Sequence, residues 1–223
     1  HYTLANVIWY ILLAVTVLSW VYSLVRKLSA IMERRRRGKE KEEILIQRVR
    51  EAGLNGGGIW DIIEYNGSMY VTVVTDKSID GHINKQGFAM YRGDKHEDGS
   101  FTWTQVIGDH STSCYDFGLG INYSMSCNMW VYNGYLYLGT YNDPMLDLAE
   151  VPASGNFELL YNDLDHSIYL YRMDADGNFQ QVAGKDDNPY FPDGPIGNLG
   201  AGLGNNSNQY VWRYGEHNGE LYI

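Results

Sequence analysis

Apolar and polar positions divide the chain into two regions with different patterns. Residues 3–25, TLANVIWYILLAVTVLSWVYSLV, form 23 consecutive positions without a charge. A helix of that length can cross the hydrocarbon core of a bilayer. After residue 58, short apolar runs rich in Tyr, Val and Ile alternate with Gly, Asn and Asp, as strands alternate with turns. The pattern predicts a transmembrane helix in residues 1–27 and an all-β domain over residues 54–223.

A basic segment over residues 28–53 separates these regions. It contains RRRR at 34–37 and then EKEEILIQRVREA, whose apolar positions have roughly helical spacing. We interpret it as a juxtamembrane helix or linker, with the lipid bilayer as a partner through residues 3–25. The positive-inside rule places this basic flank in the cytoplasm. A buried core helix and a secretory signal peptide are the alternatives for the apolar segment.

Asn-Gly dipeptides flanked by apolar runs predict three β-hairpins. These are IWDIIEYNGSMYVTVVT at 59–75, MWVYNGYLYLGT at 129–140 and VWRYGEHNGELYI at 211–223. A two-residue hairpin turn needs positive φ at both positions, which Asn and Gly accept. Each hairpin also carries a tryptophan, and we expect Trp60, Trp130 and Trp212 to mark equivalent innermost strands.

A second strand pair also recurs along the chain. GFAMYRGDKHEDGSFTWTQVIGD at 87–109 matches SIYLYRMDADGNFQQVAGK at 167–185, each with Tyr-Arg, an Asp-Gly turn and an aromatic strand. Gly-Leu-Gly occurs at 118–120 and again at 202–204. The repeating unit therefore has four antiparallel strands, and repetition of such units is typical of β-propeller blades. A β-sandwich of unrelated hairpins is the alternative.

These blades resemble a family of bacterial and archaeal extracytoplasmic propeller proteins. Asp98-Gly99-Ser100-Phe101 and residues 176–179 also look like the Asp-box of sialidase-like propellers. The resemblance covers residues 58–223 and implies the fold and a surface or secreted setting, without implying a specific chemistry. We expect a partial β-propeller of two blades and half of a third, preceded by the transmembrane helix. The remaining blades would come from further chain or from another subunit, because propellers close with four to eight blades.

Charge is distributed unevenly and bears on both partners and location. From residue 51 onward, 7 basic residues accompany 23 acidic ones. This balance argues against nucleic acid as a partner, since binding it requires a cationic face. The basic flank places the β-domain in the cytoplasm, whereas its composition and the resemblance favour the outside. Long domains translocate despite flanking charge, so we favour a membrane protein with an extracytoplasmic propeller.

The predicted loops place a candidate site at one end of the strands. Two connections per unit are short Asn-Gly or Asp-Gly turns, and the other two are long, at about 76–87, 109–127, 141–167 and 185–209. Long loops on a rigid scaffold commonly carry binding sites. Their acidic and aromatic residues could hold a sugar, a peptide or calcium, or could simply be solvated. The candidate ligand-binding residues are Asp143, Asp147, Asp163, Asp165, His166, Asp186, Asp187 and Tyr190.

Other residues give weaker chemical signals. Arg92 and Arg172 occupy the same place in successive units, which favours a structural role over carboxylate binding. Residues 174–178, DADGN, lack the closing Glu of an EF-hand and are interpreted as a turn. Cys114 and Cys127 could form a disulfide or remain reduced, and no spacing suggests zinc.

Three functions fit these patterns. The favoured one is a membrane-anchored, non-catalytic module that binds carbohydrate or peptide at the long-loop end. The alternative is a glycan-active hydrolase of sialidase-like architecture, with a carboxylate pair from the acidic loops. The third is that the N-terminal segment is unrelated to the propeller and is joined to it artificially.

Overall fold

A computed structural model describes residues 58–75, 77–79, 82–84, 86–145, 148, 151–152, 155 and 157–223, with scattered residues between 13 and 36. The chain separates into two compact units, His1–Gly53 and Leu54–Ile223. The predicted transmembrane and juxtamembrane helices fall largely outside the described residues. Within the described part of the chain, no helix is both long enough and apolar enough to span a membrane.

The second unit is mostly β, and its first sheet has five strands. β1 (Gly58–Tyr65), β2 (Ser68–Val74), β5 (Ala89–Lys95) and β6 (Phe101–Gly108) form an antiparallel meander. β7 (Tyr115–Asp116) adds to β6 in parallel. A small hairpin, β3 (Lys77–Ile79) with β4 (His82–Asn84), lies in the connection between β2 and β5.

The second sheet repeats the meander with four strands. β8 (Ser126–Tyr132), β9 (Tyr135–Tyr141), β10 (Leu170–Met173) and β11 (Phe179–Ala183) are neighbours in that order. The helix α3 (Phe157–Asp165) lies in the β9–β10 connection and was not predicted. A third, two-stranded sheet pairs β12 (Gly215–His217) with β13 (Glu220–Tyr222). The antiparallel four-strand unit is therefore present twice, and over the described residues the sheets do not close into a ring.

The three Asn-Gly turns confirm the predicted hairpins. Asn66, Asn133 and Asn218 have φ of 49°, 48° and 52°, and the glycine that follows each of them also has positive φ. Each pair joins two antiparallel strands directly. The local sequence therefore determines these turns, because other residues at both positions would be strained.

Trp60 and Trp130 lie in the matching first strands of the two meanders, as expected, but they do not occupy equivalent positions within those strands. Asp61 and Asn128 stand the same number of residues before their turn asparagines. Asp61 pairs with Thr72 in the first sheet, and Asn128 pairs with Gly139 at the matching place in the second. Trp60 falls in the register shift between Ile59 and Asp61, so it is a bulge residue. Trp130 instead pairs with Tyr137 inside the ladder. The equivalent residues are Asp61 and Asn128, and β1 and β8 lie against each other.

Trp212 also differs from Trp130, because it precedes β12 and lies outside any strand. It stands six residues before its turn asparagine, as Trp60 does, whereas Trp130 stands three before its own. The three hairpins are therefore similar in their turns and strands, but their tryptophans do not occupy matching positions.

The repeated Gly-Leu-Gly segments form a matching left-handed turn in each unit. Gly118 and Leu119 have φ of 62° and 56° in η1 (Phe117–Gly120), and Gly202 and Leu203 have φ of 65° and 57° in η2 (Ala201–Gly204). The Gly118 N–H donates to the Phe88 carbonyl at 2.8 Å. The Gly202 N–H donates equivalently to the Ile168 carbonyl, also at 2.8 Å. A side chain at Gly118 would meet the Cα of Gly87, so the close approach needs glycine.

The Asp-Gly turns between β5 and β6 and between β10 and β11 are also formed as predicted. Asp98 accepts hydrogen bonds from the hydroxyl and the backbone N–H of Ser100, and these bonds hold the pKa of Asp98 below its usual value. Asp174 accepts from the backbone N–H groups of Asp176 and Asn178 at 3.0 and 2.9 Å, which closes its own turn. The interpretation of residues 174–178 as a turn is confirmed.

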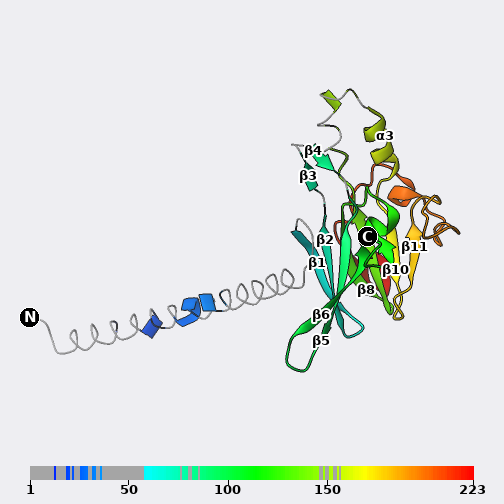
Figure 1. The fold of residues 1–223 in the computed structure, drawn as a ribbon. Helices are drawn as coiled ribbons and strands as arrows, with labels where there is room; N and C mark the ends of the chain where they lie inside the picture. Colours follow the sequence, from blue (N-terminus) through cyan, green and yellow to red (C-terminus); the bar gives the residue numbers. More distant parts are fainter. Residues whose placement is uncertain are drawn as a thin grey trace, which may run out of the picture. The chain divides into compact units, whose positions relative to one another are not determined.

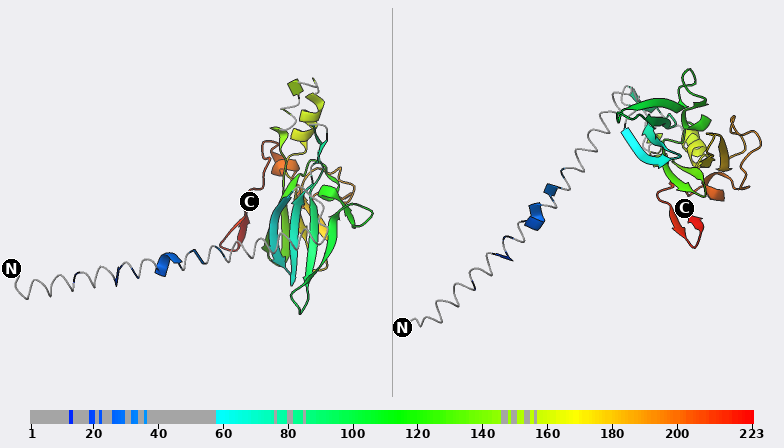
Figure 2. Two further views of the ribbon diagram at one scale, coloured as in Figure 1. Left: turned by 60° about the vertical axis from the view of Figure 1, so that its left-hand side comes forward. Right: turned by 90° about the horizontal axis from the view of Figure 1, so that it is seen from below.

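Short and long connections lie at opposite ends of the sheets. Figure 1 shows β3, β4 and α3 at one end and the β5–β6 turn at the other, and the left view of Figure 2 shows the same separation. We call the end with the longer connections the long-loop end. One core joins the two sheets, and its largest buried side chains include Phe88, Met90, Ile107, Leu136, Leu138, Tyr169 and Tyr171.

Candidate functional site

An aromatic cluster occupies the long-loop end of β1 and β9. It consists of Trp60, Tyr141, Tyr210 and Trp212, and we call it the aromatic pocket. Trp60 lies near the start of β1 and Tyr141 is the last residue of β9, so both stand opposite the Asn-Gly turns. Tyr210 forms an antiparallel backbone bridge with Tyr141. Backbone pairing therefore brings the η2–β12 connection alongside the end of β9.

The rings of the aromatic pocket form a continuous chain. Ring centroids are 5.5 Å apart for Trp60 and Tyr141, 4.6 Å for Tyr141 and Tyr210, and 6.1 Å for Tyr210 and Trp212. Trp212 is 64% exposed, Tyr210 45% and Trp60 38%. Single exposed aromatic residues are common on protein surfaces, whereas several exposed aromatic residues in contact with one another indicate a site where another molecule binds.

Two hollows adjoin this cluster and share Trp212. One, of about 400 Å³, is lined by Tyr141, Tyr210 and Trp212. The other, of about 470 Å³, is lined by Trp60, Asp61, Asn128, Met129, Trp130, Trp212, Arg213 and Tyr214. Both volumes lie in the range of small-molecule sites, and the second combines apolar rings with a carboxylate, an amide and a guanidinium group.

Asn128 connects the sheets at the base of the larger hollow. Its side-chain oxygen accepts from the Trp60 indole at 2.8 Å, and its amide donates to the carbonyls of Val211 and Trp212 at 2.7 and 3.2 Å. Asp61, the equivalent residue of the first sheet, accepts from the backbone N–H of Met129 at 2.7 Å. Asp61 of β1 thus bonds to the backbone of β8, and Asn128 of β8 bonds to the backbone that precedes β12. We call these contacts between successive repeats the seam, and this position holds it together.

The smaller hollow has a carboxylate at its margin. The Tyr141 hydroxyl donates to Asp143 Oδ2 at 3.1 Å, and Asp143 Oδ1 accepts from the backbone N–H of Met145 at 3.0 Å. Burial, followed by the hydrogen bond to Asp143, raises the pKa of Tyr141 well above its usual value. Tyr141 therefore stays a neutral donor. Among the sequence candidates that the structure describes, Asp143 is the one beside the aromatic pocket.

Asp165 and Asp187 lie in a second group around Lys185, and His166 follows Asp165 in the chain. Lys185 Nζ is 2.5 Å from Asp165 and 3.6 Å from Asp187. The hydrogen bond with Lys185 lowers the pKa of Asp165, and burial opposes this shift without reversing it. The His166 ring stacks on Tyr123 at 4.7 Å. This arrangement neutralises the carboxylates and does not leave them as an open acidic site.

The other candidates are scattered. Asp163 is buried in α3, where its backbone carbonyl accepts from Asn142 at 2.9 Å, so it anchors the helix to the end of β9. Asp186 lies in the β11–η2 connection next to Gly194. Asp147 lies outside the described residues. The structure therefore distributes the seven described candidates over several places instead of gathering them into one site.

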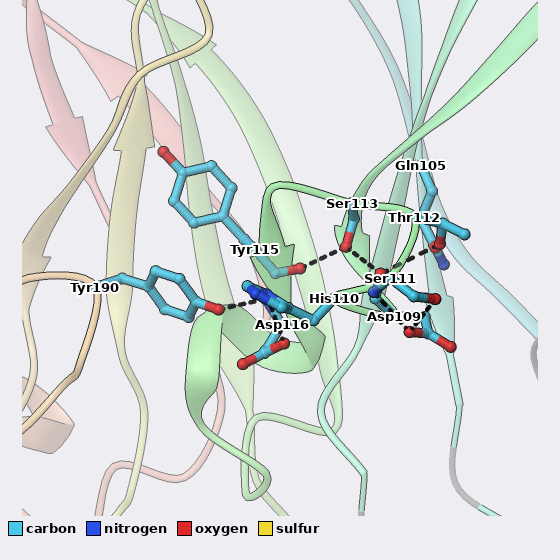
Figure 3. A network of polar contacts seen from close by, with 9 residues as sticks. All are labelled: Gln105, Asp109, His110, Ser111, Thr112, Ser113, Tyr115, Asp116 and Tyr190. Atoms are coloured by element: carbon cyan, nitrogen blue, oxygen red, sulfur yellow. Dashed lines mark hydrogen bonds and ion pairs between the residues drawn. The ribbon is translucent and has the colours of Figure 1, made fainter.

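Tyr190, in the β11–η2 connection, contacts a polar network in the β6–β8 connection, which Figure 3 shows from close by. Its hydroxyl accepts from the backbone N–H of Asp116 at 3.0 Å, and its ring packs on Tyr115 at 5.3 Å. His110 Nδ1 lies 3.3 Å from Asp116, a pairing typical of catalytic bases. The nearby hydroxyl of Ser111 donates instead to Asp109 Oδ1 at 2.7 Å. The network therefore stabilises the loop and offers no activated nucleophile among these residues.

The arginines have structural roles in equivalent places. Arg92 pairs with Tyr70 across the ladder and lies 3.0 Å from Asp94. Arg172 pairs with Tyr137, and its guanidinium carbon lies 4.3 Å from the ring centroid of Tyr135. The structural interpretation of both residues is supported by this shared register.

Neither a metal site nor a disulfide is formed by the described residues. Over that part of the chain, no group of three or more His, Cys, Asp or Glu side chains is arranged to hold a metal ion, so the structure adds no support for calcium. Cys114 is exposed and Cys127 is buried, and both thiols are free. Burial raises the pKa of Cys127 well above its usual value, which leaves that thiol inert.

Sequence reasoning used the tryptophans as scaffold markers and so missed the aromatic pocket. The available signal was that Tyr141 and Tyr210 both fall where a predicted strand meets a long loop. A comparison of the chain with family models, curated proteins and solved structures finds no match.

Proposed function

We propose that residues 58–223 are part of a β-propeller that binds a ligand at its long-loop end without transforming it. Two meanders of equal strand order support the fold, because each places its Asn-Gly turn and its Gly-Leu-Gly turn equivalently. The Tyr65 hydroxyl donates to the Gly134 carbonyl at 2.7 Å, and Tyr132 donates likewise to Gly219. Such a contact repeated from unit to unit is expected of successive blades.

The observation that carries the binding function is the aromatic pocket itself. Three of its four rings are at least 38% exposed and adjoin hollows of about 400 and 470 Å³. Aromatic rings with a few fixed polar groups are the usual lining of ligand sites. Asn128 and Asp61 are held in place by the seam, so the polar groups of the larger hollow are pre-organised. A carbohydrate or a peptide fits this combination.

Binding without catalysis is favoured over glycan hydrolysis. A glycosidase needs a carboxyl group whose pKa is raised so that it can act as general acid. The hydrogen bond from Lys185 shifts the pKa of Asp165 in the opposite direction. The serine hydroxyls near His110 are likewise directed to other partners.

Glycan and peptide arrays probed with the purified chain test this proposal. We expect a ligand whose signal falls at least about tenfold in Trp212→Ala, since loss of a central aromatic contact commonly has that effect. Phe101→Leu, an aromatic change at the opposite end of the sheets, is the matched control and should leave binding unchanged. Product analysis on any bound glycan follows, and release of hydrolysis products would favour the enzymatic alternative.

We further propose that the N-terminal segment anchors this module to a membrane, with the β-unit on the extracytoplasmic side. The charge-free run at 3–25 supports the anchor. Protease added to intact cells should cleave the β-unit if this orientation holds. Protection until the membrane is permeabilised would place the unit in the cytoplasm.

A further inference from the structure

We propose that the aromatic pocket binds an organic ammonium group, with Tyr141, Tyr210 and Trp212 facing the cation and Asp143 supplying negative charge. This inference rests on the proposed binding function and names the chemistry of the ligand. Aromatic faces attract cations through the ring quadrupole, and Trp and Tyr are the strongest of the natural side chains in this respect.

Ring orientation separates this ligand from an uncharged flat one. Tyr210 and Trp212 meet at 87°, Tyr141 and Tyr210 at 54°, and Trp60 and Tyr141 at 43°. A sugar ring stacks best on one open plane. Mutually inclined rings instead present electron-rich faces to a compact group from several directions, which is the arrangement that recognises methylated ammonium ions.

The electrostatics of the pocket also favour a cation. The lining of the smaller hollow is Tyr141, Tyr210 and Trp212, and it includes no basic side chain. Asp143 accepts the Tyr141 hydroxyl proton in a hydrogen bond at 3.1 Å, which increases the electron density of that ring. Arg213 lines the adjoining hollow, where Asp61 is also present. The excess of 23 acidic over 7 basic residues from residue 51 onward attracts cations to the unit as a whole.

A charged probe and its neutral isostere test the inference. Choline and 3,3-dimethylbutan-1-ol have the same shape, and they differ in the charge of the quaternary centre. Titration of the purified chain with each, followed by calorimetry and tryptophan fluorescence, should give binding of choline about tenfold tighter than of the alcohol. Equal affinities, or no binding of choline at millimolar concentration, would overturn the inference.

Variants assign the binding to this pocket. Tyr210→Leu should weaken choline binding about tenfold, whereas Tyr210→Phe, which keeps the ring face, should retain most of it. Trp212→Leu provides a second test at a side chain that is 64% exposed, so its loss does not disturb the core. Phe101→Leu is the matched control for loss of an aromatic ring elsewhere. Unchanged choline affinity in both Tyr210→Leu and Trp212→Leu would place the cation elsewhere and refute the proposal.

Failure of the inference and failure of the proposed function give different results. If an array ligand binds in a Trp212-dependent manner while choline does not bind, the pocket recognises an uncharged ligand and the binding function stands. If choline binds and no carbohydrate or peptide does, the pocket serves a small ammonium compound, and the assignment to carbohydrate or peptide is wrong.

Discussion

Removal of the Asn128 side chain should separate the units at their seam. Asn128→Ala deletes one acceptor and two donor contacts, which reach Trp60, Val211 and Trp212. These contacts join β8 to β1 and to the segment that precedes β12, and the residues are separated by 68, 83 and 84 positions in sequence. The variant therefore perturbs a connection that no single hairpin can replace.

The expected magnitude follows from the number and exposure of these bonds. Each neutral hydrogen bond contributes about 1 kcal/mol to the free energy of unfolding, and three would contribute about 3 kcal/mol. Because Asn128 is half-buried and faces an open hollow, water recovers part of the loss. We expect a decrease of about 2 kcal/mol, which for a domain of this size lowers Tm by roughly 4–8 °C.

Urea denaturation and calorimetry of the purified chain measure this change. Thr104→Ala is the matched control, because Thr104 is an exposed residue of β6, and its removal should change the free energy of unfolding by less than about 0.5 kcal/mol. A loss in Asn128→Ala no larger than in the control would show that the seam does not depend on this side chain. The register argument that equates Asn128 with Asp61 would then lose its energetic support.

Three further predictions concern packing, thiol chemistry and pH. A Cβ at Gly87 would lie 2.5 Å from a backbone atom, so Gly87→Ala should lower the free energy of unfolding by about 2 kcal/mol or more in a denaturant titration. Gly200→Ala is the control, because a Cβ there meets nothing within 4 Å and should leave the free energy of unfolding nearly unchanged. Cys114 should react with a thiol reagent in the native protein and Cys127 should react only after unfolding, so two rapidly reacting thiols would contradict the burial of Cys127. The pKa of Asp165 is lowered in the folded state, so the ionised carboxylate stabilises the fold above about pH 4, and this stabilisation is lost as the pH falls through the folded-state pKa. The difference in the free energy of unfolding between the native protein and Asp165→Asn should therefore shrink over that pH range. A difference that does not change with pH would exclude the ion pair with Lys185 as its cause.

The sequence predicted the hairpins because their determinants are local. Positive φ at Asn-Gly and the Asp-Gly turns depends on the turn residues themselves, and both were assigned correctly. Trp60 lies at a register shift in β1, whereas Trp130 is paired within the β8–β9 ladder, so the two tryptophans do not occupy equivalent positions. Spacing to the turn was the available warning, since Trp130 stands three residues before its asparagine and the others six.

The sequence directed attention to the long-loop end, where the aromatic pocket lies, but it did not indicate the residues of that pocket. Acidic loop residues were selected by type, yet Lys185 pairs with Asp165 and Asp187, and Asp163 is buried in a helix that the loop pattern did not indicate. The aromatic pocket combines residues from positions 60, 141, 210 and 212, which meet through pairing between distant segments. Contacts of that range follow from the arrangement of the sheets and are not encoded in any one loop.

The Asn-Gly turns have a consequence for the chemical lifetime of the protein. Glycine offers no side chain to hinder attack of its nitrogen on the preceding asparagine, so such dipeptides convert through a succinimide to isoaspartate, which lengthens the main chain by one carbon. The carbonyls of Gly134 and Gly219 are the acceptors for Tyr65 and Tyr132 of the preceding unit. Spontaneous ageing at one turn would therefore loosen a neighbouring sheet as well as its own.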